Sequence, residues 1–133
     1  MENNWKQKTL ENLEKEVWRQ FDSDSRLVRR TKELRKIQLS SFTIEDLRLM
    51  IGQRFSLDYL IPLALESLTE DLFAEGDLYK GDLLKSVLSI GTEFWDNNKN
   101  YWTELNELIK DKRLEIAEKR IDCDKFDECK YRK

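Results

Sequence analysis

Apolar residues recur along this chain at the spacing of helices, and the most apolar segment lies near its middle. In SLDYLIPLALESLTED, residues 56–71, leucine, isoleucine and alanine fall nearly all the way round a helical wheel. Neighbours must cover such a helix on several sides. Because Pro62 lacks an N–H and obstructs the preceding turn, we expect a start near Ser56 and a distortion around the proline. The pattern predicts a central helix over about 56–71.

Three shorter amphipathic helices are predicted before the central one. The first covers about 5–21, where the recurring apolar residues are Trp5, Leu10, Leu13, Val17 and Phe21. The second covers 26–36 and follows turn-forming residues that can cap it. The third covers 44–51: Thr43 with Asp46 three residues later resembles a capping box, and Gly52 is expected to end the helix in a left-handed conformation.

A loop and further helices are predicted after the central helix. The segment FAEGDLYKGD has two Gly-Asp pairs and predicts tight turns, and a helix follows from about Asp82. A short aromatic turn over 92–98 precedes a last long helix that runs to about residue 121. The tail 122–133 has no periodicity, and we expect it to be frayed. We therefore predict one all-α domain over 1–133, an irregular bundle of about six helices.

Charge is distributed unevenly along the chain. The net charge is only −3, but residues 41–82 carry nine Asp/Glu against three Lys/Arg, which is a local charge of −6. An acidic surface of this kind attracts a basic partner and repels nucleic acid. The alternative is an ordinary set of solvated helix faces.

The residue types argue against most catalytic and metal sites. The chain has no histidine, which excludes Ser-His-Asp and Cys-His pairs and zinc sites of the Cys/His type. Gly76 and Gly81 have the spacing of a phosphate-binding loop, but Asp82 stands where its lysine would be and would repel phosphate. The carboxylates lack the spacing of a calcium loop. We expect no enzyme, no cofactor and no bound metal.

Compartment and cysteine chemistry follow from the remaining composition. No run of eighteen apolar residues predicts a membrane span, and the first ten residues lack the apolar core of a secretion signal, so we expect a cytoplasmic protein. Cys123 and Cys129 are either two free thiols or a disulfide that closes the tail.

The acidic stretch contains the candidate binding residues. Its carboxylates are expected at helix ends and on the loop, where they can reach a partner, and Tyr79 between the two Gly-Asp pairs is a candidate aromatic anchor. The set is Glu66, Glu70, Asp71, Glu75, Asp77, Tyr79 and Asp82. The alternatives are simple solvation, or pairing with arginines, for the carboxylates and a half-buried loop tether for Tyr79.

The basic cluster in the 26–36 helix suggests a different function. Arg26, Arg29, Arg30, Arg35 and Lys36 could serve a small nucleic-acid-binding regulator. However, acidic residues surround the cluster and no interleaved aromatics follow as stacking platforms. A solvated face, or pairing with the acidic centre, is the favoured interpretation.

Several runs together resemble a known family. FTIEDLRLMIGQ, LDYLIPLALESL, EGDLYKGDLLKSVLSI and FW, preceded by LVRR and ELRK, are similar to the immunity proteins of bacterial contact-dependent growth inhibition (CDI) systems, over about residues 27–95. The resemblance implies a cytoplasmic antitoxin without catalysis that binds the C-terminal toxin domain of a cognate CdiA effector. Many such toxins are nucleases, whose substrate grooves are basic, so an acidic inhibitor surface is physically sensible. We expect a monomer in a 1:1 complex, with no role for nucleic acid or membrane. The resemblance identifies no binding residues.

Overall fold

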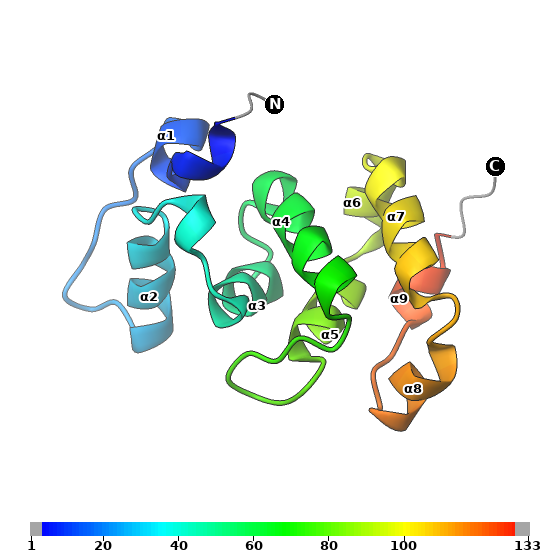
Figure 1. Ribbon diagram of the computed structural model, residues 1–133. Coiled ribbons are helices and arrows are strands. Elements are labelled where there is room, and N and C mark those ends of the chain that lie inside the picture. The colour runs from blue at the N-terminus through cyan, green and yellow to red at the C-terminus, as the bar shows by residue number, and fades with distance from the viewer. Residues whose placement is uncertain (1–3, 130–133) are drawn as a thin grey trace.

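Helices dominate the structure, a computed structural model that describes residues 4–129 (Figure 1). Within that part of the chain no strand forms, and the only β-type pairing is an isolated bridge between Glu75 and Lys80. The all-α prediction is confirmed, although the helices are shorter and more numerous than expected. They are α1 (Leu10–Glu14), α2 (Arg26–Leu34), α3 (Ile44–Gly52), α4 (Leu57–Glu70), α5 (Asp82–Leu88), α6 (Thr92–Asp96), α7 (Lys99–Ile109), α8 (Arg113–Glu118) and α9 (Asp124–Asp127), with 3₁₀ turns η1 (Trp5–Gln7) and η2 (Leu39–Ser41).

The central position of α4 agrees with its apolar sequence. The helix packs against α3, α5 and α7, and Leu60, Ile61 and Ala64 are fully buried in the core. It begins directly after Ser56, as predicted, and Pro62 lies inside it. In Figure 1 the chain before α3 lies on one side of α4 and the chain from α6 onward lies on the other. The central helix therefore lies between the two peripheral parts of the molecule.

The start of α3 is fixed by the predicted capping box. The Thr43 hydroxyl accepts the Asp46 N–H at 3.1 Å, and the Asp46 carboxylate accepts the Thr43 N–H at 3.0 Å. The expected end is wrong in detail. Gly52 is the last helical residue and its φ is not positive; the left-handed conformation falls instead on Arg54 and Ser56. The Arg54 guanidinium stabilises this turn by donating to the carbonyl oxygens of Ile51 and Ser89.

The predicted first helix over 5–21 is wrong. The helix α1 stops at Glu14, Lys15 takes a left-handed φ of 55°, and the chain then runs without helix to Ser25. We call residues 15–25 the N-terminal strap. Val17 is 71% exposed and Phe21 is 53% exposed, so these two apolar residues do not pack in the core. Polar contacts with α2 and with Arg35, the residue after it, hold the strap. The apolar spacing had instead predicted that these residues form a helix packed on the core.

The C-terminal part differs from the expected long helix and frayed tail. The predicted helix is broken between α7 and α8, and α9 docks on the core with Phe126 fully buried. The Phe126 ring stacks on Trp102 and meets Trp95 edge-on, and the Trp102 indole N–H donates to the Phe126 carbonyl oxygen at 2.9 Å. The expectation of fraying is therefore wrong for residues 122–129, and 130–133 lie outside the described residues. Both cysteines are free thiols.

Candidate protein-binding site

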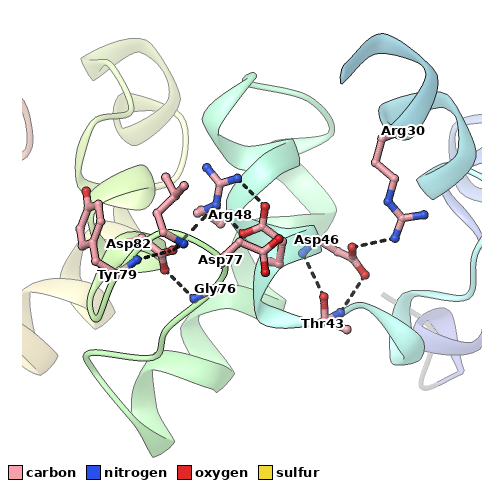
Figure 2. Close-up of polar contacts among 10 residues, drawn as sticks. Arg30, Thr43, Asp46, Arg48, Gly76, Asp77, Tyr79 and Asp82 are labelled. Carbon is pink, nitrogen blue, oxygen red and sulfur yellow. Dashed lines mark hydrogen bonds and ion pairs between the residues drawn. The ribbon is translucent and has the colours of Figure 1, made fainter. Parts of the chain in front are cut away.

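The loop between α4 and α5 is built around one buried carboxylate. We call residues 71–81 the Gly-Asp loop. Asp82, the first residue of α5, accepts backbone N–H groups from Gly76 at 2.7 Å and Leu78 at 3.0 Å, with a longer contact to the Tyr79 N–H at 3.4 Å (Figure 2). Its side chain is shielded from water, which strengthens such charge-assisted bonds. The loop thus has a fixed shape.

A second carboxylate holds the loop from α3. Glu45 accepts the Asp77 N–H at 2.8 Å and also binds the Arg48 guanidinium, whose Nε lies 2.6 Å from Glu45 Oε1. Arg48 in turn lies 3.9 Å from the Asp82 carboxylate. The Arg48 hydrogen bond, helped by the Asp77 N–H, lowers the pKa of Glu45 below its ordinary value, although burial opposes the shift. Both loop anchors are therefore tied to one arginine, and Glu45 is ionised at neutral pH.

Two glycines are required by this arrangement. A Cβ at Gly76 would lie 2.7 Å from Glu45 Oε1 and 3.2 Å from the Glu45 Cα, so the loop could not approach α3 as closely. Gly81 has a φ of 92°, which side chains rarely adopt, and a Cβ there would lie 2.9 Å from Ile121 Cδ1. Ile121 follows α8, so the C-terminal segment supports the base of the loop.

The loop presents a mixture of charge and apolar surface to solvent. Glu75, Asp77 and Lys80 are exposed. Between them Leu78 is 60% exposed and Tyr79 is 38% exposed, with the Lys85 ammonium 6.0 Å from the Tyr79 ring. Carboxylates beside two exposed apolar side chains on a rigid backbone suit recognition of a protein surface.

The structure separates the candidate residues into three groups. Asp71, Glu75, Asp77 and Tyr79 lie together on the Gly-Asp loop, where the Asp71 carboxylate also accepts the Phe73 N–H at 3.1 Å. Glu66 and Glu70 lie on α4 beside a hollow of about 300 Å³, with Glu66 paired to Lys6 at 2.6 Å.

Asp82 forms the third group alone. It was expected at the surface, but it is 2% exposed, so the expectation that it reaches a partner is wrong. The reason is local: a carboxylate directly after Gly81 lies under the loop, where the backbone N–H groups of the turn converge on it.

Sequence reasoning missed Glu45, Arg48 and Leu78. Leu78 stands between the two Gly-Asp pairs, so its exposure could have been inferred from the turn signals on either side. No comparable signal marks Glu45 and Arg48, because they are 32 and 34 residues from Asp77 and Asp82, respectively, and meet the loop only through packing of α3 on α5.

The basic cluster of α2 is partly engaged within the molecule. Arg35 is buried, Arg30 pairs with Asp46 at 3.1 Å, and Arg29 donates to the Asp24 carbonyl oxygen. Pairing of Arg30 with the acidic centre was among the favoured interpretations. This internal engagement weakens the nucleic-acid alternative, which needs free cations along the whole face.

Neither a metal-binding cluster nor a membrane-spanning helix forms within residues 4–129. No three Asp, Glu or Cys side chains of that range are grouped where they could hold a metal ion. No helix within the range has the length and apolar character needed to cross a membrane.

Comparison with known proteins places the chain in a family. The model of the family described as CDI immunity proteins matches residues 12–105, which is well over half of the chain. Neither curated proteins nor solved structures gave a match. The matched region includes α2 to α6 and the entire Gly-Asp loop, whereas α8 and α9 lie beyond it. The chain therefore belongs to the family of CDI immunity proteins.

Proposed function

We propose that this protein binds the C-terminal toxin domain of a cognate CdiA effector in the cytoplasm and neutralises it without catalysis. One monomer meets one toxin domain. The Gly-Asp loop, with the exposed end of α4, covers a basic active site of the nuclease type. Asp71, Glu75, Asp77 and Tyr79 make the principal contacts, Glu66 and Glu70 extend them, and Asp82 acts only by holding the loop.

The observation that carries this proposal is the set of hydrogen bonds that hold the loop. Two carboxylates from α3 and α5, Glu45 and Asp82, hold four N–H groups of the loop in place. A loop already held in its bound shape loses little conformational entropy on association, so more of the contact energy becomes affinity. Rigid presentation of acidic and aromatic side chains is what occlusion of a basic groove requires.

Electrostatics favours a nuclease-type target. A groove that binds nucleic acid must attract phosphates, and the carboxylates of residues 66–77 offer negative charge in their place. Complementary charge raises association rates toward about 10⁸–10⁹ M⁻¹s⁻¹ at low salt. Fast capture suits an inhibitor that must bind a toxin before the toxin finds its substrate.

The test is binding and protection with the toxin domain encoded beside this protein. The loop variant E75K/D77K/Y79A should bind the purified toxin at least about tenfold more weakly and fail to protect cells that express it. The matched control E93K/E104K makes the same charge change at exposed positions on α6 and α7 and should bind normally.

Two results would defeat the proposal. A wild-type protein that neither binds the toxin domain nor rescues growth would remove the function itself. If the loop variant bound as tightly as wild type while retaining its helical circular dichroism, the interface would lie elsewhere on the molecule.

A further inference from the structure

Exposed large apolar side chains fall mainly in two stretches of the described part of the chain. One is the Gly-Asp loop, with Leu78 and Tyr79. The other is the N-terminal strap and the start of α2, where Leu27 and Val28 are 41% and 40% exposed and the more exposed Val17 and Phe21 precede them. Leu114 is the remaining exposed side chain of this kind, and it stands apart on α8.

The first half of α2 projects from the molecule. Every residue from Ser25 to Arg30 is exposed, whereas Thr31, Lys32 and Leu34 in the second half are buried. The projecting half therefore displays two aliphatic side chains among three arginines. We call Phe21, Arg26, Leu27, Val28 and Arg29 the α2 surface. Its charge is opposite to that of the Gly-Asp loop, because its charged residues are Arg26 and Arg29, whereas three carboxylates outnumber one lysine on the loop.

Two cations hold the strap against α2. The Lys32 ammonium donates to the Arg19 carbonyl oxygen at 2.7 Å and to the Asp24 carboxylate at 2.8 Å, and lies 4.8 Å from the Phe21 ring.

Arg35 donates to the Glu16 carbonyl oxygen at 2.8 Å, pairs with Glu14 and stacks 4.3 Å from the Trp18 ring. Burying cations is energetically costly. Here Lys32 and Arg35 hold the strap in a conformation that leaves Phe21 exposed to solvent. The contacts of these two cations therefore fix the strap with the Phe21 side chain at the surface.

The element that carries the α2 surface is linked to the proposed binding site through the start of α3. Arg30 of α2 pairs with Asp46, and the preceding residue, Glu45, accepts the Asp77 N–H of the Gly-Asp loop. Figure 2 shows α2 on one side of the α3 N-terminus, joined to it by the Arg30–Asp46 pair, and the loop on the other. A single partner seated over the α3 N-terminus would meet both.

We propose that the toxin domain is held by two adjoining surfaces of opposite charge. The Gly-Asp loop covers the basic site of the toxin, and the α2 surface binds an acidic patch with apolar side chains beside that site. This inference rests on the proposed function and adds a second contact region on the partner. A protein patch fits better than nucleic acid, because Leu27 and Val28 have no flat face on which bases can stack. Two adjoining patches of opposite sign also specify the orientation of the partner.

The experiment compares two matched variants in binding to the purified toxin domain. R26E/L27S changes one exposed cation and one exposed leucine of the α2 surface and leaves the Arg30–Asp46 and Lys32–Asp24 pairs in place. K112E/L114S makes the same exchange at exposed positions before and within α8. We expect about a tenfold or greater loss of toxin affinity for R26E/L27S and less than about a twofold change for K112E/L114S. Unchanged circular dichroism and melting temperature show that both variants fold.

The outcomes separate this inference from the proposed function. If R26E/L27S binds the toxin as wild type does while E75K/D77K/Y79A does not, the α2 surface is no part of the interface and only this inference is overturned. The inference is also overturned if wild type retards RNA or DNA at low salt, R26E/L27S does not, and toxin binding is equal. Failure of wild type to bind the toxin would overturn the function and this extension together.

Discussion

Asp82 illustrates how a single buried carboxylate can organise a surface loop. Its two oxygens accept three backbone N–H groups around a side chain that is itself shielded from water. An unsatisfied buried donor destabilises a protein considerably more than a satisfied one stabilises it. The side chain therefore contributes to the shape of the loop and to the stability of the fold.

We expect Asp82→Ala to lower the free energy of unfolding by about 2–4 kcal/mol, because several N–H groups lose a charged acceptor together. Urea unfolding followed by circular dichroism measures this. Asp77→Ala is the control, since its backbone N–H makes the contact with Glu45 and its side chain is exposed. Equal stability of the two variants would show that Asp82 does not hold the loop.

The pKa of Glu45 makes loop anchoring sensitive to acid. The pKa is lowered in the folded protein, chiefly by the Arg48 hydrogen bond, so the ionised form favours folding above the ordinary glutamate value. This stability is lost as pH falls from about 4.3 through the lower folded pKa. Glu45→Gln should be less stable than wild type at neutral pH, and the difference should shrink in acid. Urea unfolding of both proteins at a series of pH values tests this, and a constant difference would contradict it.

At the scale of elements, the strap and α2 form one unit joined by polar contacts. The strap has no helical hydrogen bonds of its own; the side chains of Lys32 and Arg35 hold it, together with an edge-on contact of the Trp18 ring with Phe55. Such segments are candidates for local opening, because few buried apolar contacts hold them. The unit should open before the core around α4.

Arg35→Met should release the strap. We expect a stability loss of about 1–3 kcal/mol, discounted because the paired Glu14 is partly exposed, and faster tryptic cleavage after Lys15 and Arg19. Arg29→Met is the control, since the hydrogen bond from Arg29 to a carbonyl oxygen is exposed, and it should change stability by no more than about 0.5 kcal/mol. Cleavage at the wild-type rate in Arg35→Met would show that other contacts order the strap.

At the scale of the whole molecule, charge of opposite sign is separated between neighbouring surfaces. The acidic loop and the basic α2 surface lie on either side of the α3 N-terminus, while the net charge stays near neutral at −3. Because the net charge is small, a charged partner responds to the nearer patch rather than to the total charge. We therefore expect the proposed partner to be recognised by its pattern of charge.

Association with the toxin should depend strongly on salt. Raising sodium chloride from about 50 mM to about 500 mM should lower the association rate constant at least about tenfold and change the dissociation rate constant little, because salt screens long-range attraction more than close contacts. Stopped-flow or surface-based kinetics measures both constants. The variant E75K/D77K should show a shallower dependence; an equal slope would mean that the loop does not steer the encounter.

The sequence alone determined what depends on local composition and periodicity. A segment apolar on all sides has to be buried, so the central helix 56–71 was predictable, and the Thr43–Asp46 box needs only residues three apart. The family was likewise recognisable from runs that lie within the matched region.

Only the tertiary structure decided which charged residues face solvent and which segments stay helical. Glu45 meets the loop through the packing of α3 on α5, and Phe126 is buried because Trp95 and Trp102 offer it a place. The strap leaves the helical pattern of Val17 and Phe21 because cations of α2 and the residue after it bind its carbonyl oxygens. In each case the deciding partner is distant in sequence, and short-range periodicity carries no information about contacts that form only when the chain folds.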